Sequence, residues 1–173
     1  MKQIVLAAAG LVLLPIVGAR VLLQGAPGAD EDGSLRAFLA RFEEATSRFI
    51  NGDSELWKAS VSQRDDATIM GGWGAYEQGW NQVGARYEWA AARFRESGAR
   101  VQVEYLSSAV SGDLAFSVAI ERSEALVAGQ DKPAPMTLRV THAFRKEDGE
   151  WKLIHRHADP LIDKTAPDAV LVQ

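Results

Sequence analysis

The segment from Thr137 to Pro160 constrains the fold of this chain more than any other stretch. It consists of two runs with strand-like composition on either side of Glu147-Asp148-Gly149. A three-residue connection with glycine in the left-handed position is a common β-hairpin loop. The segment therefore predicts an antiparallel hairpin with two long arms.

The predicted loop decides which residues of the two arms oppose each other. Directly opposed residues of antiparallel strands share a face of the sheet, and a slip of one residue regroups every side chain. Counting outwards from Lys146 opposite Glu150 gives the pairs Thr141–His155 and Arg139–His157. One face then carries Arg139, Thr141, His155 and His157, with Ala143, Leu153 and Trp151 nearer the loop, and the other carries Leu138, Val140, His142, Phe144, Lys152, Ile154 and Arg156.

The first of these faces combines polar groups with a large indole, which favours a ligand pocket on that side. The second face is mostly aliphatic and aromatic, which favours packing against a partner element. The alternative is that the polar face meets water, because alternation alone does not orient a sheet.

Composition limits the classes of function. Hydrophobic residues make up 47% of the 173 positions and charged residues 24%, which is ordinary for a globular protein. The formal net charge is −4, and without Lys2 and Arg20 of the leader the body carries about −6. Such a charge disfavours nucleic-acid binding. The absence of cysteine excludes disulfides and cysteine metal sites.

The N-terminal region, residues 1–29, reads as a targeting element plus linker. An apolar run from Ile4 to Val17 is followed by small residues, as in a signal peptide. An uncleaved membrane anchor is the first alternative, although the run is short for a helix that needs about 20 apolar residues to span a bilayer. An extension from a misplaced start codon is the second. We therefore expect an exported protein, periplasmic or secreted, whose N-terminal segment contacts the membrane if it is retained.

The remaining chain predicts one α+β domain over residues 30–163, followed by a flexible tail over 164–173. Helical spacing of apolar residues follows the cap candidate Ser34, and a short helix follows Asp53 or Ser54. A third helix begins near Tyr76 or Gly79 and ends at Gly98. The predicted strands are a short one at 68–70, two longer ones at 99–110 and 114–127, and the hairpin arms. Helices on one side of a curved antiparallel sheet form a cone with a concave, partly apolar space, where small ligands usually bind.

Several pieces of the sequence resemble a known family. They are Asn51-Gly52-Asp53, the segment from Asp66 to Gly72, Gly79-Trp80, and above all RVTHAFRKEDGEWKLIHRHADP at Arg139–Pro160. Over roughly residues 35–162 the chain is similar to SnoaL-like members of the nuclear transport factor 2-like, ketosteroid isomerase-like superfamily. The resemblance implies a cone-shaped curved sheet wrapped around three N-terminal helices (the cystatin-like roll), a deep pocket and frequent homodimers. It does not imply one activity, since members include isomerases, cyclases, dehydratases, hydrolases and proteins without catalysis.

Candidate catalytic residues are His155, His157 and Asp66, with Asp159 as a further carboxylate. His155 and His157 share a face of a strand, which suits either a general base or two ligands of a divalent metal. A metal would need a third ligand, for which Asp159 has the right parity. The alternative is a structural role, and we expect neither a metal nor a cofactor.

Candidate ligand-binding residues begin with Arg139, whose guanidinium would bind a carboxylate or another anion inside an apolar cone. Its alternative is an exposed position on the rim of the sheet. The other candidates are Thr141, Trp57, Trp73, Tyr76 and Trp151.

Three hypotheses follow from these residues. The first is a domain that binds a small hydrophobic or anionic molecule. The second is a cofactor-independent proton-transfer enzyme, an isomerase, cyclase or dehydratase acting on a hydrophobic carbonyl compound. The third is an interaction module that forms a homodimer through Val140, His142, Phe144 and Ile154.

Overall fold

The computed structural model describes residues 29–171, with side chains from residue 33 onwards except that of Val170. Of the predicted signal peptide or anchor plus linker at 1–29, residues 1–28 lie outside the described residues, and Ala29 is the first residue of a helix. Among the helices that are described, none is both long and apolar enough to cross a membrane.

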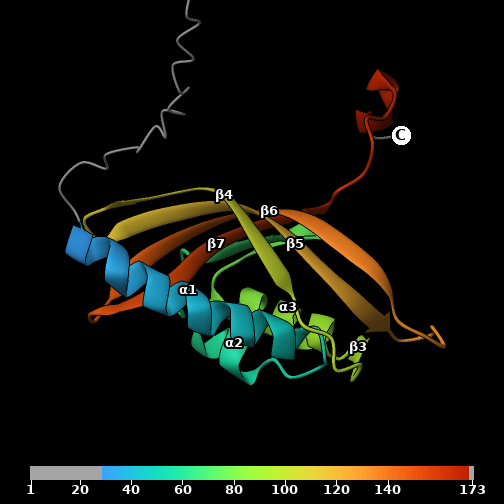
Figure 1. Cartoon of the computed structure of the whole chain (residues 1–173), viewed down its shortest axis with the longest axis horizontal. Coiled ribbons are helices and arrows are strands. Elements are labelled where there is room, and N and C mark those ends of the chain that lie inside the picture. The colour runs from blue at the N-terminus through green and yellow to red at the C-terminus, as the bar shows by residue number, and fades with distance from the viewer. Residues whose placement is uncertain (1–28, 172–173) are drawn as a thin grey trace, which may run out of the picture.

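The core of the structure is a curved sheet of seven strands (Figure 1). Its strand order is β2-β1-β7-β6-β5-β3, and β4 pairs with β5 beside β3. The long strands form an antiparallel meander, as predicted, whereas β1 joins β7 in parallel. The bounds are β1 Thr68–Gly71, β2 Gly74–Gln78, β3 Phe94–Arg95, β4 Gln102–Ser111, β5 Leu114–Val127, β6 Ala134–Glu147 and β7 Glu150–Pro160.

Three α-helices lie on one side of this sheet, against its concave face (Figure 1). They are α1 Ala29–Phe49, α2 Glu55–Ala59 and α3 Trp80–Ala91. A short 3₁₀ helix, η1 Pro167–Val170, follows the last strand and lies away from the sheet. The predicted α+β class, with helices segregated to one side of an antiparallel sheet, is confirmed.

The hydrophobic core forms where α1 crosses the hairpin of β6 and β7. The apolar stripe of α1 packs Phe38 and Phe42 against Phe144, with ring centroids 5.4 and 5.9 Å away. Trp57 of α2 adds its ring 4.5 Å from Phe42. Burial of such aromatic side chains supplies much of the free energy that holds helices on a sheet.

The hairpin turn differs from the prediction by one residue. Glu147 pairs with Glu150, so Asp148-Gly149 alone forms the loop. Both loop residues have positive φ, 52° and 84°. This is the pattern of a two-residue loop whose twist matches that of the strands, for which Asp-Gly is a favoured sequence.

A β-bulge in β7 then changes the register a second time. Phe144 pairs with Leu153 but Ala143 pairs with His155, so Ile154 is the extra residue. Leu153 is also bonded on its other side, to the backbone of Ser60 and Ser62. Two corrections follow: the true partners are Thr141–His157 and Arg139–Asp159, and Leu153 and Trp151 share the face of Phe144 rather than that of Arg139.

The region before α3 contains a strand that the sequence did not predict. Tyr76 belongs to β2, and the helix begins after Gly79, which has φ 77°. The helix also ends at Ala91, earlier than the predicted Gly98, and β3 follows it.

Candidate functional site

The concave side of the sheet holds a cavity of about 480 Å³, which opens between the helices and strands β5 to β7. Its volume falls within the range of about 300–1,000 Å³ usual for small-molecule sites. Apolar side chains such as Leu138, Met136 and Ala158 form much of its wall. Polar groups enter it at few places between its floor and its mouth.

A buried ion pair contributes both partners to the cavity lining. Glu121 of β5 and Arg156 of β7 are 5% and 8% exposed. Arg156 donates from Nη1 to Oε1 at 3.0 Å and from Nη2 to Oε2 at 2.7 Å. This two-pronged geometry is the strongest that a guanidinium and a carboxylate can form. Burial alone would lower the pKa of Arg156, but the charge of Glu121 and its hydrogen bonds outweigh burial and raise that pKa. The ring of Trp57 lies 5.2 Å from the guanidinium carbon.

His142 stands behind the ion pair, with 3% of its surface exposed. Its Nε2 lies 2.6 Å from Arg156 Nη1, and its Nδ1 lies 3.4 Å from Ser117 Oγ. Arginine can only donate, so Nε2 accepts and the ring is neutral, with its proton on Nδ1. Burial, together with the Arg156 cation, lowers the pKa of His142 well below its ordinary value. His142 therefore orients Arg156 and does not act as a base in the cavity.

An aromatic wall closes the helical side of the cavity. Trp57 and Tyr87 pack edge to face, with centroids 5.6 Å apart. Within the described part of the chain, neither Trp57 Nε1 nor the Tyr87 hydroxyl has a hydrogen-bond partner. Burial raises the pKa of Tyr87 to about 12, so the hydroxyl keeps its proton at neutral pH. The wall thus contains two hydrogen-bond donors, Trp57 Nε1–H and the Tyr87 hydroxyl, among apolar side chains.

The mouth of the cavity carries Trp73 from the connection between β1 and β2. Its ring is 45% exposed and packs 5.2 Å from Phe94. Arg86 of α3 also lines the cavity and donates to the Gly74 carbonyl at 2.8 Å. The Arg86 guanidinium lies 3.5 Å from Glu77, which neutralises it.

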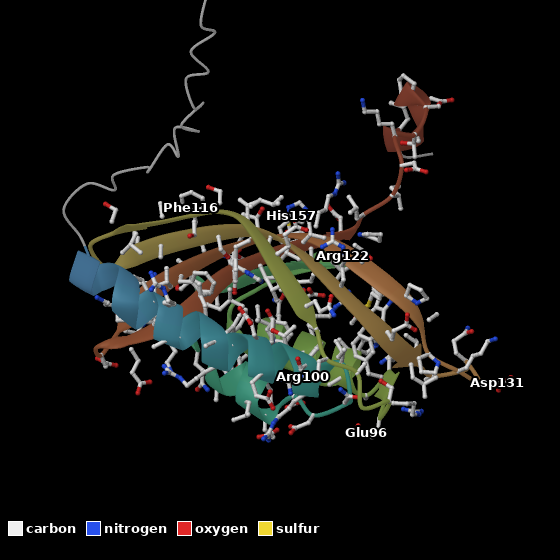
Figure 2. The ribbon with its side chains drawn as sticks, in the orientation of Figure 1. Glu96, Arg100, Phe116, Arg122, Asp131 and His157 are labelled. Carbon is white, nitrogen blue, oxygen red and sulfur yellow. The ribbon has the colours of Figure 1, made fainter. Side chains whose placement is uncertain are left out.

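The four residues expected to meet in the pocket lie together, but on the other face of the sheet. Arg139, Thr141 and His157 are exposed and His155 is partly so, and none of the four lines the cavity. Figure 2 shows His157 on the side of the sheet away from the helices. The prediction that these residues face inward is wrong. The bulge keeps all four on one face of the sheet, but α1 packs against the other face, so the four lie on the convex side.

The convex-face residues satisfy one another and their neighbours. Asp159 Oδ2 lies 3.1 Å from His157 Nε2 and 3.6 Å from Arg139 Nη2. Thr68 Oγ1 and His155 Nδ1 are 2.8 Å apart. The structure of residues 29–171 contains no cluster of three or more metal-ligating side chains, His155, His157 and Asp159 included.

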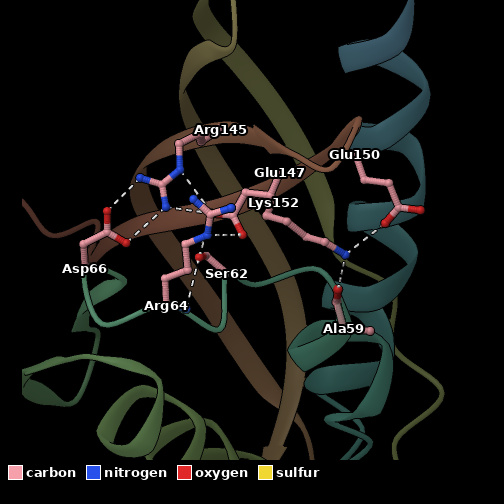
Figure 3. A network of polar contacts seen from close by, with 8 residues as sticks. All are labelled: Ala59, Ser62, Arg64, Asp66, Arg145, Glu147, Glu150 and Lys152. Atoms are coloured by element: carbon pink, nitrogen blue, oxygen red, sulfur yellow. Dashed lines mark hydrogen bonds and ion pairs between the residues drawn. The ribbon is translucent and has the colours of Figure 1, made fainter.

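Asp66 lies outside the cavity as well, in a network that ties the segment before β1 to the hairpin (Figure 3). Arg145 donates to both oxygens of Asp66, at 2.7 and 3.1 Å, and also binds Glu147 at 2.7 Å. The hydrogen bonds from Arg145 lower the pKa of Asp66. A mostly exposed carboxylate held by an arginine braces the hairpin and is a poor proton acceptor, so its geometry does not support the role of catalytic base.

The aromatic candidates divide between the cavity and other parts of the molecule. Trp57 and Trp73 line the cavity. Tyr76 is 70% exposed on β2, and Trp151 is buried in the core, where Nε1 donates to Ser34 Oγ at 3.0 Å. Neither belongs to the cavity lining.

Sequence reasoning missed Glu121, Arg156 and Tyr87 as site residues. A signal for Arg156 was present, because it fell on the predicted apolar face of the hairpin together with Val140 and Phe144. An arginine is almost never fully buried unless it is paired, so its position indicated that a carboxylate elsewhere in the sheet is buried on the same face.

Comparison with known proteins supports this architecture. A family model described as the SnoaL-like domain matches residues 31–163. None of the curated proteins compared with the chain matches it.

Among solved structures, a nuclear transport factor 2-like superfamily protein from Salmonella enterica serovar Typhimurium superposes with a TM-score of 0.67 at 14% identity, covering 81% of this chain and 97% of that one. A protein proposed to be a dehydratase of the same family, from Streptomyces avermitilis, gives 0.62 at 21% identity, with 79% and 100% covered. A protein with a cystatin-like fold from Caulobacter vibrioides gives 0.57 at 17% identity, with 82% and 94% covered. These likenesses establish a shared fold. The chain shares the fold of these nuclear transport factor 2-like proteins, and with the family match over most of its length it belongs to the SnoaL-like domain family.

Proposed function

We propose that this SnoaL-like domain binds a small, largely apolar molecule in the cavity between the concave sheet face and the helices. The observation that carries the proposal is the volume of about 480 Å³ that ends on the buried Glu121–Arg156 pair. Packed protein interiors contain few voids larger than a water molecule. A space of this size with a few convergent polar groups is what a ligand site requires.

Binding has more support than proton transfer. An isomerase or dehydratase of the predicted kind needs a group in the pocket that can take a proton. Among the described residues the one carboxylate that lines the cavity is that of Glu121, and Arg156 holds both of its oxygens. Because both oxygens already accept hydrogen bonds from Arg156, neither is free and directed at a ligand proton in the way that a general base requires. The dehydratase proposal made for the Streptomyces protein therefore does not extend to this chain.

The self-association surface proposed from the sequence does not support an interaction module. Val140, His142 and Phe144 are at most 3% exposed, and their strand face is covered by the helices. Ile154 occupies the bulge between the two registers of β7. The homodimer and the export of the protein stay predictions, and the three buried residues cannot supply a dimer interface.

Filling the cavity tests the proposal. Ser123 lines it on β5, so Ser123→Phe places a ring in the ligand space. Ser108→Phe makes the same exchange at an exposed position of β4 and serves as the matched control. We expect the neutral fluorescent probe phenylnaphthylamine to bind the wild-type protein and Ser108→Phe, and to lose most of its affinity for Ser123→Phe.

The result is decisive when both variants keep the wild-type circular dichroism spectrum. Equal binding by the two folded variants, or no binding by the wild-type protein, would contradict the proposed function.

A further inference from the structure

Both guanidinium groups that line the cavity already have a carboxylate partner. Arg156 is bound to Glu121 at 2.7 and 3.0 Å, and Arg86 lies 3.5 Å from Glu77. No other charged residue of the described chain lines the cavity. The cavity is therefore polar at its floor yet close to electrically neutral.

The Glu121–Arg156 pair retains hydrogen-bonding capacity on both sides. Each oxygen of Glu121 accepts one hydrogen bond from Arg156, and a carboxylate oxygen can accept more than one. Three of the five N–H groups of Arg156 are used by Glu121 and His142 in the described structure. A group that both donates and accepts can thus meet the carboxylate and the guanidinium at once.

A hydroxyl is such a group, and it carries no charge. A ligand carboxylate would bring a second negative charge beside Glu121 in a water-poor space, where like charges repel strongly. A ligand ammonium would meet the same difficulty beside Arg156. Displacing either partner of the pair would leave a buried charge unpaired, which is more costly than leaving the pair intact.

We infer that the cavity takes an uncharged, mainly apolar molecule with a hydroxyl group, and that this hydroxyl lies between Glu121 and Arg156. The inference rests on the proposed binding function and adds the chemical class of the ligand. The apolar body of the molecule lies along Leu138, Met136 and Ala158, which line the wall. The inference favours a hydrophobic ligand over an anionic one. Arg139, the arginine expected from the sequence to bind an anion, lies on the convex face and outside the cavity.

Three compounds with the same alkyl chain test the inference on the wild-type protein. Decanol, decanoate and decylamine are compared for displacement of phenylnaphthylamine at neutral pH. We expect decanol to bind at least about tenfold more tightly than either charged compound. Decanoate or decylamine binding as tightly as decanol overturns the inference but leaves the binding function standing. If neither the probe nor any of the three compounds binds, both fail.

A charge-removing variant then attributes the selectivity to the pair. In Glu121→Gln the carboxylate charge is lost and Arg156 is left with a net positive charge, so we expect the ratio of decanoate to decanol affinity to rise at least about tenfold. Glu124→Gln makes the same exchange on the outer face of β5, where Glu124 is exposed, and should leave the ratio at its wild-type value. A folded Glu121→Gln with the wild-type ratio overturns the role of the pair. Should that variant fail to fold, the comparison of the three compounds on the wild-type protein decides the inference by itself.

Discussion

The two faces of the sheet carry the same chemical pair in opposite surroundings. On the concave face Arg156 and Glu121 are 2.7 Å apart, and their side chains are 9% and 6% exposed. On the convex face Arg139 and Asp159 are 3.6 Å apart, and their side chains are 63% and 41% exposed. A histidine accompanies each pair, His142 inside and His157 outside.

The difference shows that burial, and not residue type, decides what such a pair does. Outside, water screens both charges, and an ion pair of this kind contributes about 0–1 kcal/mol to stability. Inside, the charges have lost their hydration and depend on each other, so the pair is held at close range and in one orientation. Only the inner pair can present fixed donors and acceptors to a ligand. Matched substitutions on the two faces should therefore differ in their effect on stability.

The largest contrast is expected for the phenylalanines of the two faces. Phe144 is fully buried against Phe38 and Phe42, whereas Phe116 is 41% exposed on the convex side. Removing a buried ring costs the transfer free energy and leaves a cavity, so Phe144→Ala should lower the free energy of unfolding by about 4 kcal/mol. Phe116→Ala should lower it by less than about 1 kcal/mol. Urea denaturation of both variants measures the difference, and similar losses would mean that the convex face is covered too.

The two arginines provide the next contrast. Arg156→Met keeps much of the packing volume but leaves Glu121 buried and unpaired, which should cost about 3 kcal/mol. Arg139→Met should change stability by less than about 1 kcal/mol. Thermal or urea denaturation at one pH compares them, and an Arg156→Met protein as stable as the wild type would remove the basis for a strong inner pair.

Much of the fold could be predicted from the sequence because its signals are local. The apolar stripe of α1, the predicted strands at 99–110 and 114–127 and the break between them each arise from residues close together in the chain. The hairpin loop was misjudged by one residue because Asp148-Gly149 suits both a two-residue loop and part of a three-residue loop. The bulge at Ile154 depends on the bonds that Leu153 makes to Ser60 and Ser62, about 90 residues earlier.

The site was harder to predict because it depends on which face of the sheet the helices cover. The sequence correctly grouped Arg139, Thr141, His155 and His157 on one face, but assigned the cavity to that face. Polar clusters attract attention, while the residues that matter here were single charges among apolar neighbours. Glu121 and Arg156 lie 35 positions apart and on strands that do not pair directly, so only the assembled sheet shows that they meet.

The smallest contrast is one of pH dependence between the two histidines. The pKa of His142 lies well below its ordinary value in the folded protein, because the ring is buried and faces the Arg156 cation. In the unfolded chain the pKa returns to about 6.5. The unfolded state therefore binds more protons than the folded state as the pH falls below about 6.5, and the protein loses stability there. Between pH 6.5 and 5.5 this loss should reach about 1 kcal/mol.

Substitution separates this contribution from those of other groups. Partial burial also lowers the pKa of His155, so His155 contributes to the same loss of stability at low pH. The curve of the wild-type protein alone therefore does not show how much of the loss comes from His142. The difference in unfolding free energy between the wild-type protein and His142→Gln should shrink by about 1 kcal/mol from pH 6.5 to 5.5, because the variant lacks the neutral ring. His157→Gln makes the same exchange at an exposed position of the convex face and is the matched control. The opposite result would be that the dependence of the unfolding free energy on pH disappears in His157→Gln and persists in His142→Gln. In that case the convex face controls the response to acid, and burial does not distinguish the two histidines.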